Sequence, residues 1–194
     1  MSLRDLFVSK TRVELLKVFL SNPSEIFYVR QLTRLTAQEI NAVRRELARL
    51  EKRKLVKKEQ RANRLYYQLR RDYLFYDELL SMVAKMTGLG KAIIENRKKL
   101  GRIKFAMLSG RFVRRLKRRK NEVDLLVVGE VVLAQLAALI KEAEAKRKEE
   151  INYTVMTEEE FSFRKRRHDP FVRDVLMGSR IMLIGNEEEM LAVK

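Results

Sequence analysis

The spacing of apolar residues changes near residue 100, and this change is the strongest constraint on what the chain can fold into. Before it, apolar residues recur every three or four positions, as along one face of a helix, except over 55–70. After it, short apolar runs such as 103–108 and 123–128 alternate with helical segments. Helices between strands indicate a small α/β sheet. The sequence therefore predicts an α+β protein with an α/β domain behind a helical one.

The start of the chain predicts two helices and a short strand. Thr11 and Glu14 form a capping box that opens a helix over 11–21. An extended piece over 26–28 precedes a short helix that ends near Thr36.

A longer helix and a hairpin follow. Thr36 and Glu39 repeat the capping box and open a helix over 37–52. In 55–70, two strand-like stretches flank the polar turn 61–63, where Asn63 is suited to a left-handed backbone. This order of elements is that of a winged helix-turn-helix, in which the third helix enters the major groove and the hairpin reaches the flanking backbone.

The outward face of helix 37–52 carries residue types that read bases. Its apolar residues recur at helical spacing, so the opposite face presents amides and guanidinium groups that pair with adenine and guanine. Basic residues of the hairpin suit phosphate or minor-groove contact. The predicted DNA-binding residues are Gln38, Asn41, Arg44, Arg45, Arg49, Lys57, Lys58, Arg61 and Arg64.

The stretch FYVRQLTRLTAQEINAVRRELARLEKRKLVKKEQRANRLYYQL resembles winged helix-turn-helix regulators of the ArsR and MarR type, over about residues 10–70. In that family a Gly-Leu pair follows the recognition helix, whereas this chain has Lys54-Leu55. The resemblance implies a winged helix-turn-helix domain over 1–71, although a winged helix can also serve protein contacts alone.

Helices broken at 87–90 are expected over 72–100, as a helical linker whose apolar stripe is a candidate dimer seam. The second domain is expected over 101–194. Its predicted strands are 103–108, 123–128, 151–156 and 180–184, and its predicted helices are 131–147, one from Thr157 capped through Glu160, and 170–177.

The second domain has one charged constellation. RFVRRLKRRK, at 111–120, has seven basic residues in ten, and Glu122 and Asp124 follow it. Residues two apart in a strand share a face, so these two carboxylates are expected to point at one cation. Mg²⁺ is the candidate, because the chain has no cysteine and one histidine.

The motif EVDLLVVG and the element order resemble the minimal nucleotidyltransferase domain of the DNA polymerase beta superfamily, over about 101–185. Members have a Gly-Ser pair that holds the triphosphate, where this chain has Ser109-Gly110. The expected third acid is replaced by Asn152, Tyr153 or Thr154. The resemblance implies a degenerate, catalytically inactive nucleotidyltransferase-like domain, with no metal bound and Glu122 and Asp124 as its only catalytic candidates.

The basic loop allows three readings: contact with the DNA backbone, a site for a nucleotide or acidic partner, or a solvated loop. The candidate phosphate or acidic-ligand contacts are Ser109, Gly110, Arg111, Arg114 and Arg115.

Charge favours a polyanionic partner. The chain has 43 Lys and Arg against 26 Asp and Glu, a net charge of +17, concentrated in the first third and around the basic loop. A Lys/Arg-rich proteome would also give such a charge. With no apolar run long enough for a membrane span and an acid near the N-terminus, a cytoplasmic protein without membrane contact is expected.

These features together predict a sequence-specific regulator that binds double-stranded DNA, as a homodimer, with the second domain used for dimerisation or ligand sensing. Two alternatives stay open: an active metal-dependent nucleotidyltransferase, and the antitoxin of a toxin-antitoxin pair.

Overall fold

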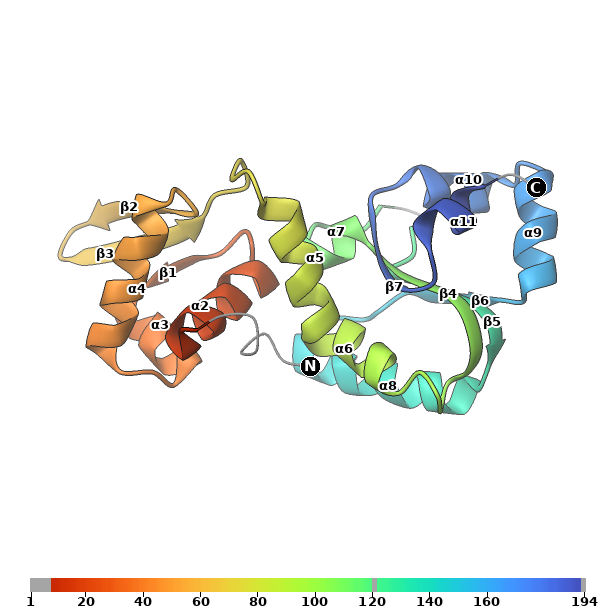
Figure 1. Cartoon of the computed structure of the whole chain (residues 1–194), viewed down its shortest axis with the longest axis horizontal. Helices are drawn as coiled ribbons and strands as arrows, with labels where there is room; N and C mark the ends of the chain where they lie inside the picture. The colour runs from red at the N-terminus through yellow and green to blue at the C-terminus, as the bar shows by residue number, and fades with distance from the viewer. Residues whose placement is uncertain (1–7, 120–121, 193–194) are drawn as a thin grey trace. The chain divides into compact units, whose positions relative to one another are not determined.

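The computed structural model of the chain describes residues 8–119 and 122–192. It is an α+β protein with two sheets, as predicted, and it divides into two compact units, Met1–Met86 and Thr87–Lys194 (Figure 1). The division falls inside 72–100, the segment expected as a linker. Helix α5 (Tyr76–Met86) belongs to the first unit and α6 (Gly88–Glu95) to the second.

Over residues 8–86, the first unit combines four helices with a three-stranded sheet. Besides α5, its elements are α2 (Lys10–Ser21), β1 (Ile26–Tyr28), α3 (Val29–Thr36), α4 (Ile40–Lys52), β2 (Val56–Arg61) and β3 (Arg64–Leu69). The strands are antiparallel in the order β1-β3-β2, and β2 and β3 form a hairpin that extends away from the helices (Figure 1).

The core of the first unit follows the apolar spacing of the sequence. Phe19 of α2 meets Phe27 of β1 edge to face, with ring centroids 5.6 Å apart. In β3, Tyr67 is buried and Tyr66 half-buried, because successive strand residues point to opposite faces. One side of the sheet is therefore core, and the other keeps polar and aromatic groups at the surface.

Two predicted helix starts are wrong. Ser9, not Thr11, caps α2 by accepting a hydrogen bond from the Arg12 N–H. The third helix begins at Ile40, not at 37, since Ala37 has a left-handed backbone with φ 50° that ends α3. Glu39 then caps α4, its carboxylate accepting from the backbone N–H groups of the first turn.

The second unit is a mixed sheet covered by helices. Besides α6, its elements are β4 (Gly101–Ser109), α7 (Gly110–Val113), β5 (Leu125–Val131), α8 (Leu133–Arg147), β6 (Tyr153–Met156), α9 (Glu158–Arg166), α10 (Pro170–Met177), β7 (Arg180–Ile184) and α11 (Glu187–Leu191). The order is β6-β5-β4-β7, with β5 parallel to β6 and β4 antiparallel to both neighbours. The predicted alternation of strands and helices is confirmed.

Strand β5 lies in the middle of this core. Leu126 and Val128 pack in one cluster with Phe161 of α9 and Val172 of α10. The alternate residues of β5 face the other side and are equally buried. Burial on both faces explains why the strand reads as a continuous apolar run.

Candidate functional site

The outward face of α4 is the first candidate site. Val43 and Leu47 are fully buried, whereas Asn41, Arg44 and Arg45 are exposed on the opposite side. No salt bridge joins Arg44 or Arg45 to another residue in the described part of the chain. Their guanidinium groups are therefore available to an external acceptor such as a guanine edge or a phosphate.

Arg49 lies on the same face but is held by a buried acid. The carboxylate of Glu46, 4% exposed, accepts from Arg12 Nε at 2.9 Å and from Arg49 Nη1 at 2.5 Å. Burial by itself would raise the pKa of Glu46, but the hydrogen bonds and charges of both arginines outweigh it and lower that pKa. The network joins α4 to α2, so Arg49 has a structural role that the sequence did not reveal.

Gln38 is not on α4, contrary to its expected place. It lies in the turn before the helix, where its Nε2 donates to the carbonyls of Thr36 and Ala37 at 3.1 and 3.0 Å. Its Oε1 accepts from the hydroxyl of Thr11 at 3.4 Å. The amide stabilises the turn, so of the residues predicted to read bases only Asn41 and the arginines lie on α4.

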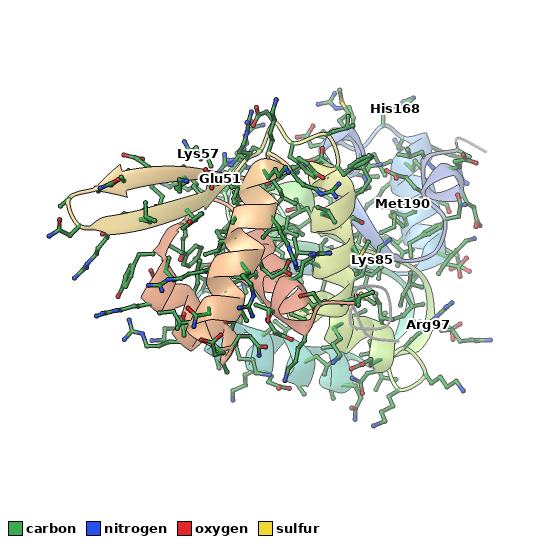
Figure 2. The ribbon with its side chains drawn as sticks, turned by 60° about the vertical axis from the view of Figure 1, so that its left-hand side comes forward. Glu51, Lys57, Lys85, Arg97, His168 and Met190 are labelled. Carbon is green, nitrogen blue, oxygen red and sulfur yellow. The ribbon has the colours of Figure 1, made fainter. Side chains whose placement is uncertain are left out.

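The hairpin carries the second group of predicted DNA-binding residues. Lys57, Lys58, Arg61 and Arg64 are all exposed, and Figure 2 shows Lys57 near Glu51 at the base of the hairpin. Lys58 pairs with Glu51 at 3.0 Å and Arg61 with Glu59 at 2.8 Å. The hairpin turn is made by Ala62, with φ 48°, instead of the expected Asn63.

Two tyrosines that were not predicted from the sequence as site residues lie beside the arginines of the hairpin. Tyr28 and Tyr66 meet edge to face, with centroids 6.0 Å apart. The guanidinium of Arg64 lies 5.3 Å from the Tyr28 ring centroid, and that of Arg61 lies 5.5 Å from that of Tyr66. The Tyr28 hydroxyl also accepts from Arg34 of α3 at 2.9 Å. In RLYYQ, Tyr66 follows Arg64 by two residues and so shares a strand face with it, and this spacing was the available signal.

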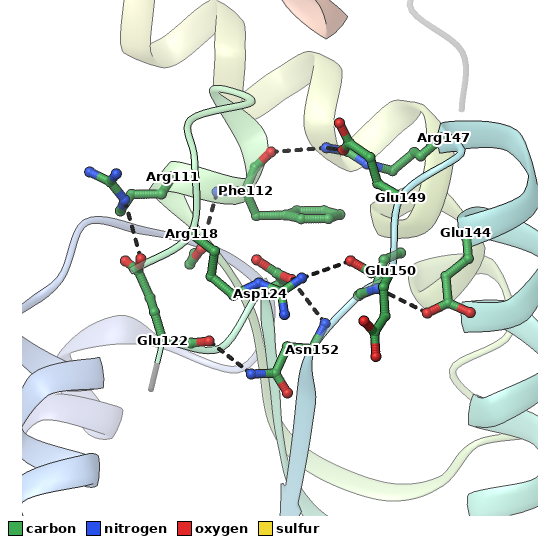
Figure 3. A network of polar contacts seen from close by, with 12 residues as sticks. Arg111, Phe112, Arg118, Glu122, Asp124, Glu144, Arg147, Glu149, Glu150 and Asn152 are labelled. Carbon is green, nitrogen blue, oxygen red and sulfur yellow. Dashed lines mark hydrogen bonds and ion pairs between the residues drawn. The ribbon is translucent and has the colours of Figure 1, made fainter. Parts of the chain in front are cut away.

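The carboxylates of the second unit do not share a strand face. Strand β5 begins at Leu125, so Glu122 and Asp124 precede it, and the expected strand start at 123 is wrong. The Glu122 carboxylate accepts from the Arg119 N–H at 2.9 Å and lies 3.2 Å from Arg111 Nε. The Asp124 carboxylate accepts from the Asn152 N–H at 2.9 Å and pairs with Arg118 at 3.1 Å (Figure 3).

Asp124 is the more buried of the two, with 5% of its surface exposed. Burial raises its pKa, against the lowering effect of the Asn152 N–H and of Arg118. Each carboxylate is thus neutralised by an arginine of the preceding loop. Among the described residues, no three His, Cys, Asp or Glu side chains gather as a metal site.

The Ser109-Gly110 turn, predicted as a phosphate or acidic-ligand contact, is occupied by contacts within the protein. Ser109 Oγ caps α7 by accepting from the Phe112 N–H at 3.2 Å. The Gly110 N–H donates to the Ser179 carbonyl at 2.7 Å, and Arg114 donates to the Ser179 hydroxyl at 3.2 Å. A Cβ on Gly110 would lie 2.1 Å from the Ser179 Oγ, so the Ser179 side chain packs directly against Gly110.

The remaining candidate contacts of the loop separate into two groups. Arg111 turns toward Glu122 and donates to the Lys117 carbonyl at 2.5 Å. Arg115 instead lines a pocket with Arg118 and with Arg147 of α8. Arg118 and Arg147 were not among the predicted contacts. Arg147 could not be predicted, because only folding brings the end of α8 beside the loop.

Comparison with protein-family models, curated proteins and solved structures finds no significant match. Within the described ranges no helix is both long and apolar enough to cross a bilayer. The functional assignment therefore depends on the geometry and charge of the two sites.

Proposed function

We propose that this chain is a sequence-specific regulator that binds double-stranded DNA through its first unit. The supporting observation is the exposed face of α4, where Asn41, Arg44 and Arg45 project from a helix fixed by its buried opposite face. These side chains match the donor and acceptor pattern of base edges in the major groove. The unit would act as a winged helix-turn-helix, with α4 as the recognition helix and the β2–β3 hairpin as the wing.

A backbone angle adds support for this assignment. Lys54, at the place of the glycine that follows the recognition helix in ArsR and MarR regulators, has φ 59°. The chain therefore turns there as a glycine would allow, although the side chain is a lysine. Leu55 next to it is buried, which fixes the start of the hairpin against the helix.

We further propose that the second unit is a nucleotidyltransferase-like domain that has lost catalysis and serves dimerisation or ligand sensing. The strand order β6-β5-β4-β7 with helices between strands supports such a fold. Engagement of Glu122 and Asp124 by arginines, and closure of the Ser109-Gly110 turn, support the loss. An active nucleotidyltransferase has less support for the same reasons, and no observation favours an antitoxin.

Selection of bound duplexes from a random DNA pool, at near-physiological salt, tests the proposal. We expect an enriched motif with two-fold symmetry, because a dimer would read paired half-sites. Arg44→Ala should relax base preference at one position, at a cost of about 1–3 kcal/mol on the preferred site. Arg61→Ala should weaken binding to all sequences alike. Tight binding without enrichment by the wild type would contradict base reading by α4.

A further inference from the structure

The loop 114–119 and the end of α8 enclose a pocket of about 300 Å³ that DNA binding by the first unit does not use. Its walls combine basic, acidic and apolar side chains: Arg115, Lys117, Arg118, Arg147, Asp124, Glu149, Glu150, Phe112 and Leu116. Four of these nine residues are basic, so the pocket can hold an anion if their charges are not already neutralised.

Arg147 is half-buried in this pocket. Its guanidinium carbon lies 4.1 Å from the Phe112 ring centroid, and 20% of its side chain is exposed (Figure 3). One amino group donates to the Phe112 carbonyl at 3.3 Å and lies 3.4 Å from Glu149. Its Nε is buried and has no hydrogen-bond partner among the described residues. A buried donor without a partner is costly and marks a place where an acceptor is missing.

The positive charge at Arg147 is also poorly balanced. Burial is the main reason that its pKa is lowered, and repulsion from Arg115 is the next, ahead of the attraction of Glu149 and Asp124. Asp124 is already engaged by Arg118 and the Asn152 N–H. Two guanidinium groups that repel one another beside an unused donor would be stabilised by an anion between them.

We propose that this pocket binds the phosphate group of a small phosphate monoester, held between Arg147 and Arg115 with Arg118 and Lys117 at the rim. Guanidinium groups pair with phosphate oxygens through two parallel hydrogen bonds, which an ammonium cannot do. The site is distinct from the Ser109-Gly110 turn, which Ser179 closes. Because Arg147 lies inside a concave wall, a free monoester reaches it more easily than a phosphate within a duplex backbone.

The binding step does not depend on the proposed DNA function, because it takes place within the second unit. Only its consequence, a change in DNA affinity when the ligand binds, rests on that function. Titrations without DNA therefore separate failure of this proposal from failure of the other.

Calorimetric titration of the full chain with inorganic phosphate and with adenosine 5′-monophosphate, at constant ionic strength, tests the site. We expect saturable binding of one ligand per chain, and none of adenosine, which has no phosphate. Arg147→Lys, which keeps the charge but loses the fork, should weaken binding at least tenfold. Arg173→Gln, which removes an exposed cation of α10 outside the pocket, should leave the affinity unchanged.

A second variant guards against misfolding, because Arg147 also packs on Phe112. Lys117→Gln alters only an exposed side chain of the rim and should weaken phosphate binding severalfold, with an unchanged thermal unfolding midpoint. Equal losses in Lys117→Gln and Arg173→Gln would indicate nonspecific attraction and overturn the proposal. No saturable binding by the wild type, or displacement of the monophosphate by short duplex DNA at equal phosphate concentration, would overturn it as well.

Discussion

Glu46 shows how one buried charge can hold the helix α4 against its neighbour α2. Its carboxylate is almost inaccessible and receives hydrogen bonds from Arg12 on α2 and Arg49 on α4. Removing one partner of such a network leaves the other charges without balance. The orientation of α4, and with it the exposed face of Asn41, depends on this contact.

Glu46→Gln should lower the free energy of unfolding by about 2 kcal/mol at neutral pH. Because the folded-state pKa of Glu46 is lowered, its contribution is complete above the ordinary glutamate pKa. That contribution is lost as the pH falls below about 4. Urea unfolding across pH should therefore show a flatter acid limb in the variant. Glu51→Gln, which breaks only the surface pair with Lys58, should cost less than about 1 kcal/mol.

The contribution of Asp124 to the free energy of unfolding is expected to change with pH in the opposite direction. Because burial raises the folded-state pKa of Asp124, the ionised carboxylate lowers stability. This loss begins as the pH rises past the ordinary aspartate pKa and is complete above the raised folded-state pKa. Asp124→Asn removes the charge but keeps an oxygen for the Asn152 N–H.

At pH 7 Asp124→Asn should therefore be as stable as the wild type, to within about 1 kcal/mol, or more stable. Its stability should also vary less between pH 4 and pH 7, by denaturant unfolding. Asp124→Ala removes the acceptor and should cost about 2 kcal/mol. Mg²⁺-dependent nucleotide turnover that disappears in both variants would instead favour the enzymatic alternative.

At the scale of elements, the connection between α4 and the hairpin stores backbone strain. Lys54, at φ 59°, is exposed, and Leu55 after it is buried. A left-handed backbone costs a residue with a Cβ about 1–2 kcal/mol, and glycine avoids this cost.

Lys54→Gly should therefore raise the free energy of unfolding by about 0.5–1 kcal/mol, after the greater entropy of an unfolded glycine is subtracted. Ala48→Gly, on the exposed face of α4, should lower it by about 1 kcal/mol. Equilibrium denaturation of the two glycine variants should show changes of opposite sign in the free energy of unfolding. A loss in both would mean that the Lys54 side chain has a stabilising contact.

For the whole molecule, the division at Met86 leads to a prediction about cooperativity. Each unit has its own sheet and its own buried core. Compact parts with separate cores unfold as separate cooperative units.

A fragment of residues 1–86 should thus unfold in one cooperative transition. Under the proposed function it should also select the same DNA sequences as the full chain, with lower affinity if dimer contacts lie elsewhere. A fragment of 87–194 should unfold cooperatively as well. Calorimetry and circular dichroism of both fragments provide the measurement. A fragment that stays unfolded would show that the cores depend on each other.

The element order of both units was predictable from the sequence, because apolar spacing follows from which face each helix or strand buries. Helix α10 and strand β7 lie at the predicted residues, and the helices over 10–21 and 133–147 differ from the predictions by one or two. The exposed basic face of α4 was predictable for the same reason. The ends of the elements were harder to predict, because Ala37 and Ala62 adopt left-handed backbone conformations that alanine does not indicate in a sequence.

Which polar groups remain available to a ligand depends on tertiary contacts. Gln38 donates a hydrogen bond within a turn, and Arg49 donates to the buried Glu46. The Gly110 N–H of the Ser109-Gly110 turn donates to the Ser179 carbonyl. The pocket around Arg147 joins residues more than 25 positions apart in the sequence, Arg118 and Arg147 among them. Local spacing specifies which face of an element is buried, but partners distant in sequence meet only when the chain folds, and those partners determine which charges remain for a ligand.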